Sequence, residues 1–171
     1  MLDRNNYYFE RDNSINWWSL LPQIVYYFYS YFELYRNGKI KSLSDKININ
    51  VPTGNFGDIV AAYFAYKMGL PVNRFICASN ENNVLTDFMN TGRYSRNRSF
   101  YATASPSMDI LVSSNLERLL YLISGKSGNI KEWMQDLNTN GEYKVDSGTF
   151  DELNRLFYGG CCDDDETENI I

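Results

Sequence analysis

The sequence predicts an α/β fold in which helices flank a parallel sheet. The β-branched run 47–51 reads as a strand, a glycine-containing turn follows it, and 59–68 has the pattern of a helix. The apolar run 72–77 then predicts a second strand, and a strand, helix and strand at this spacing form a right-handed βαβ unit with parallel strands. With 171 residues, 44% of them apolar and 22% charged, the chain suits a single globular domain.

An aromatic-rich helix is expected before this unit. Its apolar positions recur at intervals of three and four between Trp17 and Phe32, which predicts a wide apolar face, and 12–14 offers N-cap residues. Pro22 either kinks this helix or marks its true start, and 37–38 ends it before a polar link at 39–46. Because polar residues interrupt the stretch, we expect a buried helix and not a membrane span.

The second half of the chain predicts shorter elements. A short helix covers 83–89, the polar stretch 91–104 is expected to be irregular, and 113–115 can cap a helix at 116–124. Further on we expect a helix at 130–137, a strand near 142–145 and a helix at 150–157. The acidic run 163–166 suits a helix N-terminus, but the chain stops before we expect such a helix to develop, so its end looks cut.

Composition excludes several classes of protein. The chain has no histidine, which removes histidine-based catalytic triads and nearly all zinc-enzyme patterns, and we expect no metal site. A net charge of −5 without a basic stripe argues against nucleic-acid binding. Cys77, Cys161 and Cys162 make a poor disulfide framework, so reduced thiols in a cytoplasmic protein are expected. Residues 1–12 lack the apolar core of a secretory signal.

The turn between the first strand and its helix is the strongest candidate site. Gly54 and Gly57 can take positive φ and let a ligand approach the backbone, and the helix start offers unpaired N–H groups to an anion. The lysine of a P-loop and the third glycine of a dinucleotide fingerprint are both missing. On local chemistry alone, a phosphate cradle and a purely structural turn are both open.

Other polar clusters have structural explanations beside functional ones. The run 79–83 follows the second strand, where ligands collect in open α/β sheets, yet it also suits a solvated turn with a helix cap. The arginines at 93, 96 and 98 could hold an anion or lie in a solvated loop. Asp109 is expected to have a structural hydrogen-bonding role, and Arg118 with Glu117 to face solvent or pair locally.

Several motifs in order together resemble the threonine synthases, which are enzymes that depend on pyridoxal 5′-phosphate (PLP). The strings that carry the resemblance are NSINW at 13–17, QIVYYF at 23–28, VPTGNFGDI at 51–59, NEN at 80–82, SPSMDIL at 105–111 and SSNLERLL at 113–120. The resemblance therefore runs from about residue 13 to the acidic tail. It implies the fold type II architecture of PLP enzymes, with residues 1–171 forming part of the PLP-binding catalytic domain.

The resemblance also implies the binding residues. The PLP phosphate is expected on the backbone N–H groups of Gly54, Asn55, Phe56 and Gly57, with Asp58 beside them and capping the helix. For the substrate phosphate, the resemblance suggests residues further along the chain, namely Asn80, Asn82 and Arg118.

Three departures from the family pattern bear on activity. The family forms its Schiff base through a lysine in a Phe-Lys-Asp motif upstream of the glycine turn, whereas here only Lys39, Lys41 and Lys46 precede it, in the polar link. A later family segment, whose threonine contacts the pyridine nitrogen, is missing as well. Residues 18–19 are Trp-Ser, where relatives usually carry alanine and arginine. No catalytic residue is therefore assigned in this chain.

The sequence thus supports two hypotheses of different classes. In the first, the chain is a threonine synthase fragment that supplies the PLP-phosphate loop, and the full-length enzyme converts O-phospho-L-homoserine and water to L-threonine and phosphate. In the second, it is a non-catalytic α/β module that binds a phosphorylated ligand or a complementary chain. In the first hypothesis the partners are the small molecules PLP and O-phospho-L-homoserine, and in neither is nucleic acid or a membrane expected as a partner.

Overall fold

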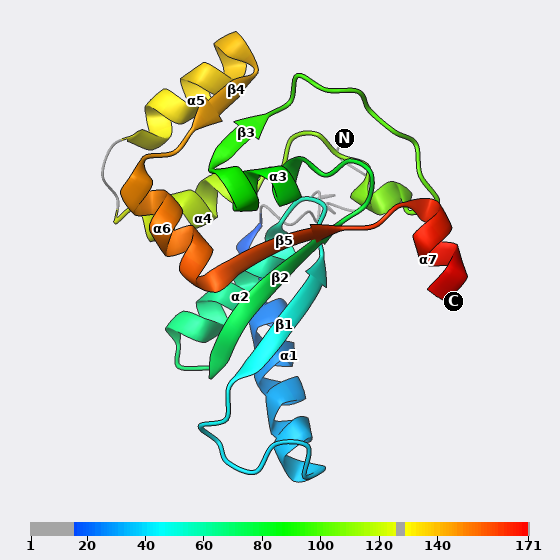
Figure 1. Ribbon diagram of the computed structural model, residues 1–171. Coiled ribbons are helices and arrows are strands. Elements are labelled where there is room, and N and C mark those ends of the chain that lie inside the picture. Colours follow the sequence, from blue (N-terminus) through cyan, green and yellow to red (C-terminus); the bar gives the residue numbers. More distant parts are fainter. Residues whose placement is uncertain (1–15, 126–128, 171) are drawn as a thin grey trace, which may run out of the picture.

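The main sheet has three parallel strands in the computed structural model, which describes residues 16–125 and 129–170. Strands β1 (Ile47–Pro52), β2 (Val72–Ser79) and β5 (Phe157–Cys161) lie in the order β1-β2-β5. Helix α2 (Gly57–Lys67) joins β1 to β2 and starts two residues earlier than predicted. The predicted βαβ unit is confirmed, and the carboxyl ends of the three strands meet at one edge of the sheet (Figure 1).

Strand β5 was not predicted. The expected helix at 150–157 is α6 (Ser147–Leu156), which begins earlier because the Asp146 side chain caps it by accepting from the Thr149 N–H at 2.9 Å. β5 follows α6 directly, and its two glycines weaken the sequence pattern typical of a strand. A Cβ at Gly159 would lie 2.7 Å from the Thr86 backbone in α3 (Val84–Thr91). The glycine therefore permits close packing of α3 on the strand.

Helix α1 (Trp17–Arg36) has the predicted extent and contains Pro22 inside it. Its N-cap is Asn16, whose side chain accepts from the Trp18 N–H, while the predicted cap at 12–14 lies outside the described residues. The expectation of a buried helix is wrong for its outer face. Only one face, with Leu20, Ile24 and Tyr31, is buried, because no described segment covers the opposite side. No helix among the described residues is long and apolar enough to cross a membrane.

A second, smaller sheet corrects the expectation of an irregular stretch at 91–104. Strand β3 (Arg93–Ser95) pairs antiparallel with β4 (Glu142–Lys144), between α3 and α5 (Asn129–Asn140). Tyr94 and Tyr143 stack in this pair with ring centroids 5.4 Å apart. A strand of three residues is stabilised by such cross-strand contacts, which its own sequence does not reveal.

The remaining elements complete the chain. They are the 3₁₀ helix η1 (Pro106–Met108), α4 (Leu116–Ile123) and α7 (Asp164–Ile170). Helix α7 shows that the acidic run does start a helix, contrary to expectation. The Asp163 side chain accepts from the Glu166 N–H at 2.7 Å, and the other acidic residues lie in the first turn, where the helix dipole favours them.

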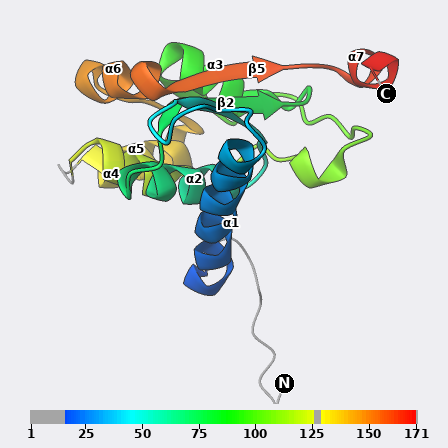
Figure 2. The same cartoon turned by 90° about the horizontal axis from the view of Figure 1, so that it is seen from below.

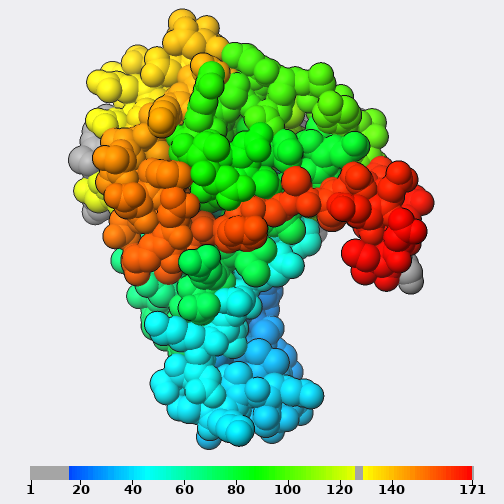
Figure 3. All heavy atoms as spheres, viewed as in Figure 1, coloured from blue at the N-terminus to red at the C-terminus, as the bar shows by residue number. Residues whose placement is uncertain are grey.

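The helices form layers around the main sheet. Helix α2 packs on β1 and β2, and α1 packs on α2, so that α1, α2 and α4 lie on the same side of the sheet (Figure 2). The link 37–46 and the end of α1 form the projecting lower part of the molecule in Figure 3. This arrangement places the turn between β1 and α2 at the carboxyl edge of the sheet, beside α1.

Gly159→Ala is expected to destabilise the protein by about 2 kcal/mol or more, because its Cβ would meet main-chain atoms of Thr86 that cannot move aside. Gly160→Ala is the matched control, since the nearest atom there is a side-chain carbon of Tyr158 at 3.8 Å. Its free energy of unfolding should stay within about 0.5 kcal/mol of the wild-type value. Denaturant unfolding followed by circular dichroism checks both, and equal effects of the two substitutions would contradict this account of β5.

Candidate functional site: a loop of unpaired N–H groups

The glycine loop (53–58) lines a cavity of about 330 Å³ at the carboxyl end of β1. Gln23 of α1 and Ser107 and Met108 of η1 close its other sides. Helix α2 starts inside this cavity, so the positive end of its dipole and its first N–H groups are directed there.

The left-handed residue in this loop is Phe56 and not a glycine. Phe56 is the N-cap of α2, and with a φ of 65° it is the one non-glycine residue with positive φ among the described residues. Gly54 is needed for space, since a Cβ there would lie 2.8 Å from the Ser107 carbonyl oxygen. The left-handed conformation of Phe56 is costly for a bulky residue and persists where surrounding packing fixes it. Phe56 is 97% buried, with 3% of its surface exposed.

The carbonyl groups of the loop are turned away from the cavity and paired. The Asn115 side chain donates to the Asn55 carbonyl at 2.9 Å, and the Asn115 N–H donates to the same oxygen at 3.1 Å. Ser113 Oγ donates to the Gly54 carbonyl at 3.3 Å. Among the described residues, the backbone N–H groups of 54–57 donate to no protein acceptor. The loop therefore presents a set of unpaired donors, a nest suited to an anion.

Ser113 and Asn115 were expected to cap α4, and this expectation is wrong for the side chain of Asn115. Asn115 occupies the N-cap position, but its side chain makes no capping hydrogen bond and contacts the glycine loop instead. It is fully buried. Local sequence could not reveal this role, because the two partners lie 60 residues apart in the chain.

A chain of buried hydroxyl groups anchors the base of the loop. Thr53 Oγ1 donates to the Ala78 carbonyl at 2.9 Å and lies 3.3 Å from Ser79 Oγ. Thr86 Oγ1 of α3 donates to the Gly160 carbonyl at 2.9 Å and lies 3.1 Å from Ser79 Oγ. These hydroxyl groups connect the carboxyl ends of β1, β2 and β5 beneath the glycine loop.

Asp58 contacts α1 instead of capping its own helix as predicted. Its Oδ1 accepts from the hydroxyl of Tyr26 and, at 3.0 Å, from that of Tyr27, while the N-cap residue of α2 has no side-chain capping bond. Burial, together with the nearby Asp58 carboxylate, raises the pKa of both tyrosines, so their hydroxyls stay protonated and keep donating at neutral pH. These bonds fix α1 against the start of α2.

The side chain of Gln23 is the one polar group of α1 in this cavity that lacks a partner. Its Oε1 is buried without a hydrogen bond. The two ends of a carboxamide are nearly the same size, so a half-turn directs the Nε2 donor to the same place. An unsatisfied buried amide oxygen beside unpaired N–H groups fits a site that holds a polar group.

Asn80 and Asn82 are buried around Asp109 and are not part of a solvated turn. The Asp109 Oδ1 accepts from Asn80 Nδ2 at 2.6 Å and from Asn82 Nδ2 at 3.1 Å. Thr103 donates to both Asp109 oxygens, its N–H at 2.9 Å and its hydroxyl at 2.8 Å. The Thr103 N–H bond is the main reason that the pKa of Asp109 lies below its ordinary value. The structural role expected for Asp109 is confirmed.

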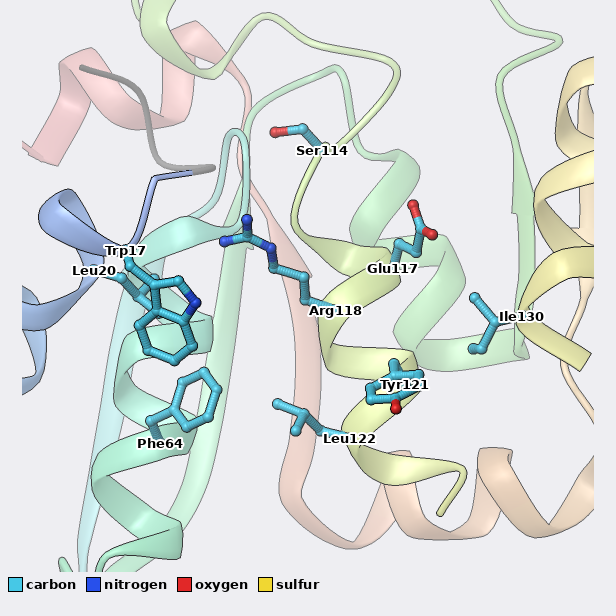
Figure 4. A pocket seen from close by; sticks show the side chains of 9 residues that line it. All are labelled: Trp17, Leu20, Phe64, Ser114, Glu117, Arg118, Tyr121, Leu122 and Ile130. Carbon is cyan, nitrogen blue, oxygen red and sulfur yellow. The ribbon is translucent and has the colours of Figure 1, made fainter. Parts of the chain in front are cut away.

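Arg118 lines a different cavity from the glycine loop. This cavity, of about 600 Å³, lies between α1, α2 and α4, and its walls are mainly apolar, with Trp17, Phe64 and Tyr121 among them (Figure 4). Figure 4 shows Arg118 extending toward the Trp17 side and Glu117 extending away from it. The structure thus places Asn80 and Asn82 in one network and Arg118 in another location.

The three arginines at 93, 96 and 98 take part in structural contacts. Arg93 pairs with Glu142 at 2.7 Å across the small sheet, and Arg98 pairs with Asp87 at 2.9 Å. Arg96 donates to the Asn138 carbonyl at 3.2 Å.

The three cysteines form no disulfide with one another. Cys77 is buried in β2, and burial raises its pKa, while Cys161 and Cys162 are exposed.

Comparison with known proteins shows which proteins the chain resembles. No protein-family model matches the chain. Threonine synthase of the yeast Saccharomyces cerevisiae is 46% identical over 169 residues, which cover 93% of this chain and 32% of the yeast protein. Human threonine synthase-like 1 is 44% identical over 156 residues, covering 90% of this chain and 21% of the human protein. The chain thus spans a third or less of the length of these relatives.

Solved structures agree with the sequence comparison. A PLP-bound threonine synthase from Brucella melitensis superposes with a TM-score of 0.84 at 38% identity, over 91% of this chain and 32% of that protein. The yeast enzyme gives 0.83 at 42% identity, over 92% of this chain and 32% of its own. The fold is that of a segment of a fold type II PLP enzyme. Over this segment, the chain is a homologue of the threonine synthases.

Asp109→Asn is expected to lower the free energy of unfolding at neutral pH, because an amide oxygen replaces one carboxylate oxygen and its NH₂ faces other donors. The folded-state pKa of Asp109 is lowered, so its stabilisation is present above the unfolded value of about 3.9 and disappears as pH falls through the folded value. The difference between wild type and variant should shrink below about pH 4. Urea unfolding from pH 7 to pH 3 measures it, with the exposed Asp151→Asn as control. A difference independent of pH would contradict this assignment.

Proposed function

We propose that this chain holds the phosphate of PLP in the glycine loop, as part of the PLP-binding domain of a threonine synthase-like protein. The observation that carries the proposal is the set of unpaired N–H groups at 54–57, in a cavity that opens at the carboxyl edge of a parallel sheet. The donors would be Gly54, Asn55, Phe56 and Gly57. The dipole of α2 adds positive potential, which matters in a chain of net charge −5.

Two further features of this chain suit a phosphate at that place. Gln23 supplies a free carboxamide at the cavity wall, which can donate after a half-turn. Asp58 is the one acidic residue of the described part of the chain that lines the cavity. One of its oxygens is held by two tyrosine hydroxyls of α1, which disperse its negative charge. Its repulsion of a phosphate is therefore weakened.

The mechanism assigned to this chain is positioning. When bound, PLP supplies an electron sink for reactions at the carbon atoms of an amino acid. The glycine loop binds one end of the cofactor, the hydroxyl chain from Thr53 to Thr86 keeps the loop fixed on the sheet, and Phe56 covers its base. In a protein of threonine synthase length, we propose that this serves the conversion of O-phospho-L-homoserine and water to L-threonine and phosphate in the cytoplasm.

We also propose that Asn80, Asn82 and Arg118 contribute to binding the substrate phosphate. Asn80 and Asn82 lie at the carboxyl end of β2, and Asp109 fixes their carboxamides. They are proposed to shape the floor on which the substrate phosphate rests, with Arg118 supplying positive charge from α4.

Among the described residues, no lysine lines the loop cavity. Lys39, Lys41 and Lys46 all precede β1. Lys46 adjoins the first residue of this six-residue strand, which at about 3.3 Å per residue places Lys46 about 20 Å from the loop. We therefore propose that the chain by itself binds PLP without a covalent bond to lysine and without turnover. This observation also favours the second candidate, a non-catalytic module that holds another phosphorylated small molecule in the same loop.

A titration with PLP, pyridoxal and inorganic phosphate tests the proposal, with binding followed by PLP absorbance and tryptophan fluorescence. PLP should bind reversibly, phosphate should compete with it, and pyridoxal, which lacks the phosphate, should bind at least tenfold more weakly. Borohydride reduction and mass spectrometry should find no adduct at a specific lysine. Equal binding of PLP and pyridoxal would overturn the phosphate-loop assignment. Tighter binding of phosphate than of PLP would favour the second candidate.

Gln23→Glu is expected to weaken PLP binding at least tenfold, about 1.4 kcal/mol, because it places a carboxylate beside the phosphate. Gln135→Glu makes the same chemical change on the exposed side of α5 and should leave the dissociation constant within about twofold of wild type. The same titration measures both variants. Equal dissociation constants for the two variants would show that the phosphate does not lie near Gln23.

A further inference from the structure

Asp58 occupies a position from which its side chain could fill the anion site of the glycine loop. It lies in the first turn of α2, two residues after the N-cap Phe56, and it is half-buried at the wall of the loop cavity. A carboxylate at such a place is attracted by the same N–H groups and the same helix dipole that attract a phosphate. Asp58 is therefore a competitor, present in the chain itself, for any anionic ligand of the loop.

Two tyrosine hydroxyls of α1 hold this carboxylate in another direction. Tyr26 and Tyr27 both donate to Asp58 Oδ1, Tyr27 at 3.0 Å, and the Tyr27 hydroxyl also lies 3.2 Å from the Asp58 carbonyl oxygen. The two tyrosine rings contact each other, with centroids 4.8 Å apart. Hydrogen bonds to a carboxylate are roughly twice as strong as those between neutral groups, so the pair fixes the Asp58 side chain against α1.

The same side of α1 also contributes to the loop cavity. Gln23, Tyr26 and Tyr27 are three and four residues apart, which puts them on one side of the helix. Gln23 lines the cavity, where its carboxamide can face a ligand. Tyr26 and Tyr27 do not line the cavity themselves, so their hydroxyl groups act on it through Asp58.

We propose that Tyr26 and Tyr27 are positioning residues that keep the anion site of the glycine loop open by holding the Asp58 carboxylate against α1. This inference deepens the proposed function and rests on it, because it concerns how the same loop admits a phosphate. Without the two hydroxyl groups, the carboxylate turns to the N–H groups at the start of α2, where its charge repels a phosphate. The tyrosines thereby set the preference of the loop for a phosphorylated ligand over the same ligand without its phosphate.

The ratio of the dissociation constants for pyridoxal and PLP measures this preference. Replacing Tyr26 and Tyr27 together by phenylalanine should lower the ratio by about fivefold or more, because the released carboxylate opposes the phosphate and not the pyridine ring. Adding Asp58→Asn to this double variant should restore the ratio to within about twofold of the wild-type value, because the side chain is then neutral. If the tyrosines only held the two helices together, the additional loss of the carboxylate would restore nothing.

Tyr31→Phe is the matched control on the same helix. Tyr31 is buried, its hydroxyl donates to the Asp45 carbonyl at 2.8 Å, and neither residue lines the loop cavity. The substitution removes a tyrosine hydrogen bond of α1 but leaves Asp58 in place, so the ratio should stay within about twofold of the wild-type value. Circular dichroism and denaturant unfolding should show that the variants keep the fold.

Asp58→Asn with both tyrosines intact is a second test that does not depend on the double variant. Its ratio should equal or exceed that of the wild type. A wild-type ratio in the double tyrosine variant, no recovery on adding Asp58→Asn, or a lowered ratio in Asp58→Asn alone would each overturn the inference and leave the phosphate-loop assignment standing. Equal binding of PLP and pyridoxal by the wild-type chain would overturn both.

Discussion

The orientation of the peptide groups at 54–57 is the constraint on which the rest of the site depends. The carbonyls of Gly54 and Asn55 face inward and accept hydrogen bonds from Ser113 and Asn115. This pairing leaves the N–H groups free to face the cavity. Without these partners, the buried carbonyls would seek other donors, and the loop would lose the arrangement that suits an anion. The start of α4 is thus as much a part of the site as the loop itself.

The location of this site follows from sequence, but its internal geometry does not. A β-branched run, a glycine turn and a helix in succession predict where the loop lies, because strand and helix periodicities are local properties. The left-handed conformation falls on Phe56, a residue with no local preference for it, and Gly54 is required by the backbone of Ser107. The requirement for Gly54 comes from a segment some 50 residues away, which local sequence patterns do not reveal.

The same division applies to the fold. The βαβ unit and the long helix α1 are predicted well, since each has a strong period and clear end signals. Strand β5 is missed because Gly159 serves the approach of α3 and weakens the strand pattern, and β3 is missed because three residues carry too little pattern. The outer face of α1 shows a related effect. The sequence predicts a helix with a wide apolar face, but only the structure shows which part of that face the protein itself covers.

Amide chemical shifts measured during a PLP titration test the central claim most directly. Two-dimensional ¹H–¹⁵N spectra of the labelled chain should show saturable downfield shifts for the N–H groups of Gly54, Asn55, Phe56 and Gly57, since each gains a charge-assisted hydrogen bond. Pyridoxal at the same concentrations should leave these four signals in place. Unchanged loop signals, with the largest shifts instead around Arg118 in the apolar cavity, would contradict the account.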